Sequence, residues 1–338
     1  MNIKKASPGL DPRNRLSQLL GEGFTVEDYD GGRPLSAQVG DAEVLLIRDV
    51  PVSGEVIDAA PNLRLIQRPG DHIRGVDVVH AARRAVFVSR IPAHVQGGAA
   101  RDVAELALSL VFALAKQHRR ARNSIRDRTV GLPKTLRIEG KTLCLVGVGN
   151  TGTELAKLAR GVGLHVIAVK RTRDESLRET LKLEALELLN ALHAQLARAD
   201  FVSLHLPVTP ETVGVIGPAE FAAMKQGAVL INISRAPLID RTALLEALRT
   251  GKLGGVGLDV YWEEPPDPSD PLFQFDNVLA TPHIAGETLE MEERLYGIVA
   301  ANILALAKGG QPDYLVAPGD PEGDNTAYKD IDTHAENK

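Results

Sequence analysis

Short apolar runs alternate regularly with amphipathic segments over the second half of the chain. Six runs predict buried strands, at residues 142–146, 165–169, 201–204, 228–233, 255–258 and 278–280. Between them, apolar residues at helical spacing predict helices, most clearly at 152–160, 186–199, 219–225 and 241–249. This alternation indicates an α/β fold built on a doubly wound parallel sheet.

The first hundred residues show a shorter version of the same pattern. Apolar runs at 42–47, 63–67 and 85–89 predict strands, and a helical patch lies at 56–60. A long helix is expected at 99–118, with almost no polar face after Glu105, and another at 289–307. A helix as apolar as the first is usually buried in a core or a subunit interface.

Composition sets limits on what the protein can be. The chain has 338 residues, of which 44% are hydrophobic and 25% charged, which suggests two globular domains. The net charge of −5 argues against general binding to nucleic acid or to an anionic membrane. The apolar run 106–115 is too short to cross a bilayer, residues 1–10 do not resemble a signal peptide, and Cys144 is the only cysteine. We therefore expect a cytoplasmic protein without membrane partners.

A glycine-rich motif provides the first chemical signal. Residues 143–152 read Leu-Cys-Leu-Val-Gly-Val-Gly-Asn-Thr-Gly, which is G-x-G-x-x-G between a predicted strand and a predicted helix. Gly147 permits a tight turn, Gly149 lets the backbone approach a pyrophosphate, and Gly152 allows close packing of helix on strand. Asn150 and Thr151 would begin the helix, whose free N–H groups attract phosphate. The motif predicts dinucleotide binding.

The end of the second strand of this unit bears on which dinucleotide is bound. An acidic residue there would bond the ribose hydroxyls of NAD and repel a 2′-phosphate. The chain instead has Lys170, Arg171, Thr172 and Arg173. Cations and a hydroxyl suit a phosphate, so the sequence favours NADP(H), and a solvent-facing basic turn in an NAD enzyme is the alternative.

Three later segments place reactive groups after successive strands. Arg235 follows the strand at 228–233, acidic residues follow the strand at 255–258, and His283 follows the strand at 278–280. Ligands of doubly wound sheets bind outside the carboxyl ends of the strands. The three groups can therefore converge on one ligand.

This ordered set resembles the D-isomer-specific 2-hydroxyacid dehydrogenases over roughly residues 40–310. The resemblance implies a Rossmann nucleotide-binding domain at 101–286, and a smaller flavodoxin-like substrate domain at 1–100 that is completed by about 287–316. It also implies a catalytic triad of Arg235, Glu264 and His283, and hydride transfer between NAD(P)H and a small 2-keto acid. Further cofactor-binding residues implied in this way are Leu206, Pro207, Thr212, Ile233, Ser234, Asp259 and Gly286, together with Arg235 and His283 themselves.

The predicted substrate loop departs from the family pattern. The resemblance places substrate-binding residues at Gly70, Asp71 and His72, alongside Arg235 and His283. Gly70 fits the pattern, but Asp71, His72 and Arg74 replace small or acidic residues. A carboxylate at Asp71 would repel a substrate carboxylate unless it points away or pairs with Arg74.

Several further expectations follow from the sequence. A dinucleotide-sensing corepressor on the same framework is the alternative function. The apolar helix suggests a homodimer, and the histidine spacings indicate no metal site. The basic stretch 119–129 is a solvated connection or, alternatively, a site for phosphate or a partner. The polar tail 317–338 is expected to be disordered.

Overall fold

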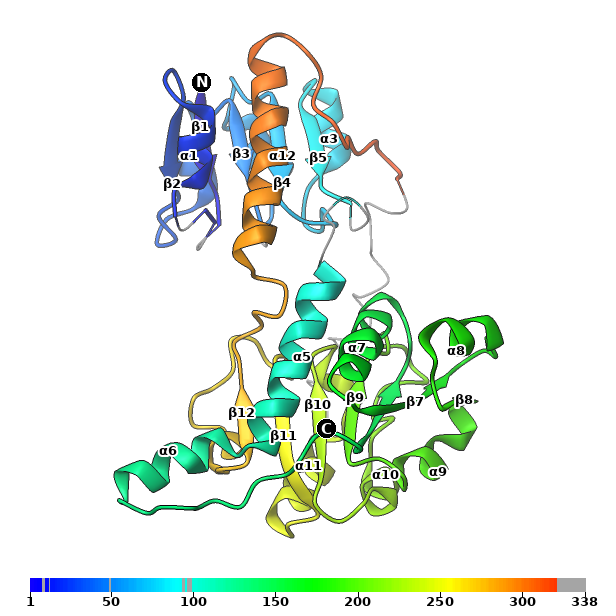
Figure 1. Ribbon diagram of the computed structural model, residues 1–338. Helices are drawn as coiled ribbons and strands as arrows, with labels where there is room; N and C mark the ends of the chain where they lie inside the picture. The colour runs from blue at the N-terminus through cyan, green and yellow to red at the C-terminus, as the bar shows by residue number, and fades with distance from the viewer. Residues whose placement is uncertain (8–9, 12, 49, 93–94, 96–98, 321–338) are drawn as a thin grey trace. The chain divides into compact units, whose positions relative to one another are not determined.

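The computed structural model describes residues 1–7, 10–11, 13–48, 50–92, 95 and 99–320. The chain divides into two compact units (Figure 1). Unit 1 comprises Met1–Gly97 with Leu289–Lys338, and unit 2 comprises Gly98–Thr288. Most of the tail for which we expect disorder, residues 321–338, lies outside the described residues.

Unit 1 contains a five-stranded, fully parallel sheet in the order β2-β1-β3-β4-β5. Its strands are β1 (Asn2–Lys5), β2 (Thr25–Asp28), β3 (Val44–Leu46), β4 (Leu65–Arg68) and β5 (Phe87–Arg90). Apolar residues of α1 (Arg15–Leu20) and α12 (Leu289–Ala307) cover one face. The other face packs on α2 (Gly54–Asp58), α3 (Val78–Arg83) and the short 3-10 helix η1 (Leu35–Ala37). This is the flavodoxin-like strand order.

Unit 2 contains a seven-stranded parallel sheet in the order β12-β11-β10-β9-β6-β7-β8. Its strands are β6 (Thr142–Val146), β7 (His165–Lys170), β8 (Ala185–Leu188), β9 (Phe201–Leu204), β10 (Ala228–Asn232), β11 (Leu253–Leu258) and β12 (Val278–Ala280). The order reverses between β6 and β9, as in the Rossmann fold. The predicted doubly wound α/β architecture is therefore confirmed.

Two helical layers cover this sheet (Figure 1). One layer has α5 (Ala99–Ala115), α7 (Asn150–Gly161) and α8 (Glu175–Leu181), and the other has α9 (Leu192–Leu196), α10 (Pro218–Ala223) and α11 (Arg241–Arg249). Residues of β6 alternate between the two layers, since Leu143 and Leu145 pack on the first and Cys144 and Val146 on the second. Three 3-10 helices complete the unit: η2 (Leu189–Ala191), η3 (Ala236–Leu238) and η4 (Pro271–Gln274).

Several predicted elements differ from the structure. The helix predicted at 186–199 is wrong, because Ala185–Leu188 forms the edge strand β8 and only Leu192–Leu196 is α-helical. Pairing with β7 outweighs the helical propensity of its leucine and glutamate residues. The strands β1 and β2 were not predicted, since their sequences Asn-Ile-Lys-Lys and Thr-Val-Glu-Asp are largely polar. The long helix at 99–118 ends earlier, at Ala115, and Gln117 has a left-handed φ of 51°.

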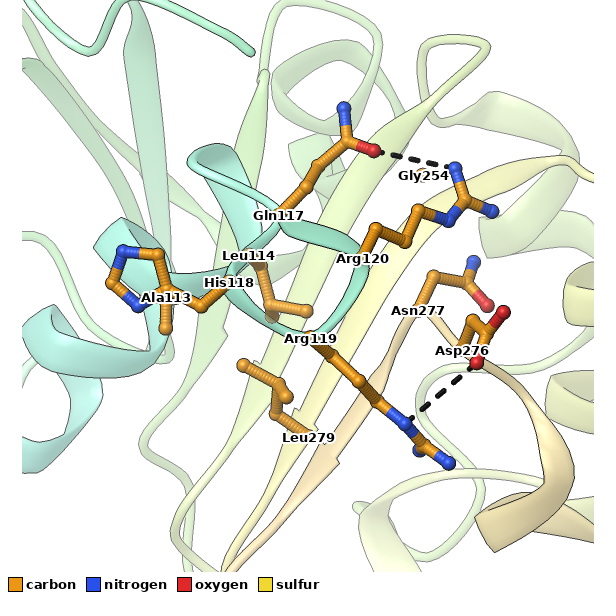
Figure 2. A pocket seen from close by; sticks show the side chains of 10 residues that line it. All are labelled: Ala113, Leu114, Gln117, His118, Arg119, Arg120, Gly254, Asp276, Asn277 and Leu279. Carbon is orange, nitrogen blue, oxygen red and sulfur yellow. Dashed lines mark hydrogen bonds and ion pairs between the residues drawn. The ribbon is translucent and has the colours of Figure 1, made fainter. Parts of the chain in front are cut away.

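The basic stretch forms a separate helix, α6 (His118–Arg126), with no buried residue. It extends away from the sheet of unit 2 (Figure 1). Figure 2 shows the pocket at its first turn, where Arg119 Nε lies 3.7 Å from Asp276 Oδ1 and Arg120 Nη1 donates to Gln117 Oε1 over 3.3 Å. Arg119 also donates to the carbonyl oxygen of Phe275 over 3.1 Å. The contacts of Arg119 thus anchor the start of α6 to the segment that leads into β12.

Within the described ranges, none of the helices is long and apolar enough to cross a membrane. The cytoplasmic location stays a prediction.

Candidate functional site

Three neighbouring strands of unit 2 carry the predicted catalytic residues just beyond their carboxyl ends. β12, β11 and β10 are adjacent in the sheet. Arg235 follows β10 by three residues, Glu264 lies in the loop after β11, and His283 lies in the turn after β12. The topology therefore brings all three to one edge of one sheet.

His283 and Glu264 form a hydrogen-bonded pair. Nδ1 of His283 is 2.8 Å from Oε2 of Glu264, and the two side chains are 49% and 39% exposed. A carboxylate only accepts hydrogen bonds, so Nδ1 carries the ring hydrogen and Nε2 is left for another partner. The second oxygen of Glu264 accepts the backbone N–H of Tyr261 over 3.1 Å. Glu264 is thereby fixed between its own loop and the imidazole.

A buried carboxylate holds the turn that carries His283. Asp259 is fully buried, and its Oδ1 accepts hydrogen bonds from Thr281 Oγ1 over 2.6 Å and from the Ile284 N–H over 2.9 Å. Oδ2 accepts the Ala285 N–H over 2.8 Å. His283 has a φ of 55°, which is uncommon for a residue with a side chain and is found mostly where the surroundings enforce it. Asp259 provides such surroundings.

A second buried polar residue shapes the turn of Arg235. Asn232 is fully buried at the end of β10; its Nδ2 donates to the Arg235 carbonyl over 2.9 Å and its Oδ1 accepts the Ser234 N–H over 3.1 Å. The Arg235 guanidinium is exposed and bonds only its neighbour's carbonyl, Ser234 O, among the residues that the structure describes. Sequence reasoning did not assign Asn232 a role, although an amide at the end of a fully buried strand was the available signal.

The glycine loop has the form expected of a dinucleotide cradle. Gly147 has a φ of 96°, and a Cβ there would lie 2.8 Å from the carbonyl oxygen of His205. A Cβ on Gly152 would lie 2.9 Å from the Gly147 carbonyl oxygen. A Cβ on Gly149 would meet nothing within 4 Å, so no protein contact requires glycine at this exposed residue before α7. The open space at the start of α7 fits a pyrophosphate group.

The segment after β9 lies against this loop. Leu206 Cδ2 would be 2.9 Å from a Cβ on Gly147, and the Leu206 carbonyl accepts a hydrogen bond from Ser234 Oγ over 2.8 Å. The Thr212 hydroxyl donates to the Pro207 carbonyl over 2.7 Å and so closes the following turn. The structure thus links three predicted cofactor segments at the point where the strand order reverses.

His205 is the most unusual titratable residue of this region. Both ring nitrogens are buried and lack a hydrogen-bond partner in the described part of the chain. Burial disfavours the imidazolium and lowers the pKa of His205 from 6.5 to about 4. Its ring packs beside Gly152, since a Cβ there would lie 3.6 Å from Cγ of the ring. Sequence reasoning assigned cofactor binding to the next two residues, Leu206 and Pro207, but gave His205 no role.

The basic residues after β7 differ in their contacts. Lys170 Nζ pairs with Asp174 Oδ2 over 2.7 Å, and Oδ1 of Asp174 also accepts the Leu177 N–H at the start of α8. Arg171, Thr172 and Arg173 are exposed. One of the cations predicted for a 2′-phosphate is thus already paired with a carboxylate.

The remaining predicted residues lie in both units. Ile233 is buried in the core beneath α5 and α7, and Gly286 follows the turn of His283. Gly70, Asp71 and His72 lie in unit 1, after β4. The Asp71 side chain is exposed. Within the described residues, no group of three or more His, Cys, Asp or Glu could hold a metal ion.

Known proteins are similar to this chain in sequence and in fold. The chain is 35% identical over 316 residues to a D-3-phosphoglycerate dehydrogenase of Archaeoglobus fulgidus, covering 87% of this chain but 58% of the relative. It is 34% identical over 282 residues to a glyoxylate reductase of Korarchaeum cryptofilum, covering 82% of each. The apo-structure of D-lactate dehydrogenase from Escherichia coli has a TM-score of 0.79 and 26% identity, covering 94% of this chain and 100% of that one.

The family match covers the unit that contains the glycine loop. Residues 108–285 match the family described as "D-isomer specific 2-hydroxyacid dehydrogenase, NAD binding domain". This range contains Gly147, Arg235, Glu264 and His283. The chain belongs to the D-isomer specific 2-hydroxyacid dehydrogenase family.

Proposed function

We propose that the protein reduces a small 2-keto acid to a D-2-hydroxy acid with a nicotinamide dinucleotide. The hydrogen bond between His283 Nδ1 and Glu264 Oε2 carries this proposal. It leaves Nε2 of a half-exposed imidazole available at the sheet edge where Arg235 also lies. Family membership supplies the reaction class, since relatives include a glyoxylate reductase and a D-3-phosphoglycerate dehydrogenase.

Each residue has a role that its chemistry can perform. The bound dinucleotide supplies the hydride. His283 gives a proton from Nε2 to the oxygen of the keto group, as a general acid positioned by its hydrogen bond to Glu264. Glu264 fixes the ring orientation through Nδ1. Arg235 binds the substrate carboxylate or keto oxygen through its exposed guanidinium and favours negative charge there.

The decisive experiment follows the absorbance of the reduced nicotinamide at 340 nm with a panel of 2-keto acids. We expect His283→Ala to lose nearly all turnover while its dissociation constant for the dinucleotide stays close to that of the wild type. Glu264→Gln keeps one acceptor oxygen and should lose less. His165→Ala is the matched control, because His165 also pairs with a glutamate, Glu184, but on the exposed start of β7. Undiminished turnover in His283→Ala would contradict the proposal, and cofactor binding without turnover of any keto acid would favour the corepressor-like alternative.

We also propose a preference for NADP(H) over NAD(H), supported by Arg171 and Thr172. Because Lys170 already pairs with Asp174, Arg171 is the principal candidate to bind a 2′-phosphate. Arg171→Ala should raise KM for NADPH by about tenfold, as expected for the loss of one charged hydrogen-bonding group, with a much smaller change for NADH. Arg178→Ala on α8, whose guanidinium pairs with Glu175, is the control. An equal rise for both cofactors would contradict this assignment.

We propose a homodimer, but its support is no longer the apolar helix on which the sequence argument relied. Six residues of α5 are buried within unit 2, so its apolar character is explained by the core: Ala104, Ala107, Leu110, Val111, Leu114 and Ala115. Large apolar side chains are exposed in the following segment, where Ile125 is 80% and Val130 96% exposed. Such side chains suit a second copy of the chain. A sedimentation mass of one chain for the wild type would contradict the dimer, and Ile125→Ser combined with Val130→Ser should dissociate it.

A further inference from the structure

Tyr261 joins the two turns of unit 2 that carry Glu264 and His283. It lies three residues after the end of β11, in the loop that contains Glu264. Its backbone N–H donates to Glu264 Oε1 over 3.1 Å. Its hydroxyl donates to the carbonyl oxygen of Thr281, in the turn after β12, over 2.7 Å. One residue therefore bonds both turns, one through its main chain and the other through its side chain.

The carbonyl that the hydroxyl reaches is part of the turn of His283 itself. The Thr281 carbonyl oxygen also accepts the backbone N–H of His283 over 2.9 Å, which closes a turn of three residues. Asp259 holds other groups of this turn, and an ionised carboxylate cannot donate to a carbonyl oxygen. The hydroxyl of Tyr261 thus holds the turn at an acceptor that Asp259 does not reach.

The ring of Tyr261 is supported from behind. Its centroid lies 5.9 Å from that of Phe273, with an angle of 65° between the ring planes, which is an edge-to-face contact. Phe273 belongs to η4, and Asp270 holds the start of η4 by accepting the Leu272 N–H over 2.9 Å. Asp270 also pairs with Arg241, at the start of α11, over 2.9 Å. The hydroxyl is therefore presented by a side chain whose position is fixed.

The phenol of Tyr261 keeps its proton. Burial raises the pKa of Tyr261 to about 12, and the negative charges of Asp259 and Glu264 act in the same direction. A carbonyl oxygen can only accept, so the bond to Thr281 requires this proton. The hydroxyl remains a donor throughout the neutral pH range.

We propose that Tyr261 is a positioning residue, whose hydroxyl sets the turn of His283 at the distance from Glu264 that their hydrogen bond requires. This inference rests on the proposed function. The side chains of His283 and Glu264 are 49% and 39% exposed, and a contact between exposed side chains holds two loops together only weakly. The bond from Tyr261 to Thr281 adds a second link between the same loops, from a half-buried ring.

Tyr261→Phe removes this link and nothing else, because phenylalanine keeps the ring and the backbone N–H. We expect kcat for the keto acid to fall by about tenfold, while KM and the dissociation constant of the dinucleotide stay close to those of the wild type. Tyr29→Phe is the matched control, since the hydroxyl of Tyr29 also donates to a backbone carbonyl, that of Arg33 in unit 1, over 2.9 Å. It should keep the kcat of the wild type.

A double-mutant cycle tests whether Tyr261 acts through the pair of Glu264 and His283. In Glu264→Ala the imidazole has lost the carboxylate that orients it, so the distance between the two turns no longer matters for that bond. Adding Tyr261→Phe to Glu264→Ala should therefore lower kcat by less than about twofold. The same tenfold loss on both backgrounds would overturn the inference, because Tyr261 would then act independently of the pair.

Trp262 gives a readout that needs no substrate. It is the only tryptophan of the chain and directly follows Tyr261. Tyr261→Phe should increase the quenching of its fluorescence by acrylamide, because the loop loses one of its bonds to the neighbouring turn. Tyr29→Phe should leave the quenching unchanged.

The outcomes separate this inference from the proposed function. Turnover by the wild type with an unchanged kcat in Tyr261→Phe would overturn the inference and leave the proposed function standing. No turnover of any keto acid by the wild type would contradict the proposed function. In that case, increased quenching of Trp262 in Tyr261→Phe would still support the link between the two turns, and unchanged quenching would overturn it.

Discussion

Replacing Asp259 by Asn tests whether the turn of His283 is held by a buried carboxylate. Asp259 accepts three hydrogen bonds from this turn, two through Oδ1 and one through Oδ2. An amide has one acceptor oxygen, so in either orientation its NH2 group faces at least one backbone N–H, that of Ile284 or Ala285. Hydrogen bonds to charged groups contribute about 1.5–3 kcal/mol each, so we expect a loss of about 2–4 kcal/mol in unfolding free energy.

The same change should affect catalysis through the position of His283. A displacement of about 1 Å at a catalytic group can lower the rate by about a hundredfold. We therefore expect kcat to fall by one to two orders of magnitude while the dissociation constant of the dinucleotide changes little. Thr281→Val removes one of the three donors and should have a smaller effect in the same direction.

Denaturant unfolding and steady-state kinetics on the same preparations provide the measurement. Asp240→Asn is the matched control, because Asp240 is an exposed N-cap of α11 that accepts one bond from the Ala243 N–H, and Asn caps helices about as well as Asp. If Asp259→Asn were as stable as Asp240→Asn and had the kcat of the wild type, the assignment of Asp259 as a positioning residue would be refuted.

Three further predictions concern the glycine loop and the residues beneath it. Gly147→Ala should destabilise the fold, since its Cβ would lie 2.8 Å from a backbone oxygen. Gly149→Ala should fold normally and weaken only dinucleotide binding, which titration calorimetry measures. Equal stability of the two variants would contradict this prediction. The pKa of His205 is about 4 in the folded protein and 6.5 in the unfolded chain, so the unfolded chain binds more protons between these two pH values. The free energy of unfolding should therefore be highest above pH 6.5 and fall by up to about 3 kcal/mol toward pH 4. His205→Gln should flatten this pH dependence in acid unfolding experiments, and an unchanged slope would refute the prediction. Burial raises the pKa of the Cys144 thiol to about 12, so native protein should not react with a thiol reagent at neutral pH until denaturant is added, and rapid native labelling would show otherwise.

Sequence periodicity predicted elements best where packing and local propensity agree. The bounds of α11, α12, β6, β9 and β12 are those predicted, because each presents apolar residues at the spacing of its own element. β8 was mistaken for a helix because its pairing with β7 is a non-local contact that outweighs its helix-forming residues. β1 was missed because its lysines read as polar, yet Lys5 is buried and pairs with Asp28 of the neighbouring strand over 3.0 Å.

The candidate site was predictable in order but not in detail. Motif order along the chain placed Arg235, Glu264 and His283 after successive strands, and the structure makes those strands neighbours. The bonds of Asn232 and Asp259 to the adjoining turns depend on side-chain geometry that no spacing rule contains. The same holds for the bond from the Tyr261 hydroxyl to the Thr281 carbonyl, since it joins turns that follow different strands.

The discontinuity of unit 1 has a consequence for biosynthesis. Its second apolar face is covered by α12, which follows the whole of unit 2 along the chain. At about 5–20 residues per second, the roughly 190 residues between these two parts take about 10–40 s to emerge from a ribosome. During that interval Leu16, Leu46 and Leu65 lack their partner helix. Unit 2 is contiguous and can fold first, so the nascent chain carries a completed second unit while one apolar face of the first unit is still without α12.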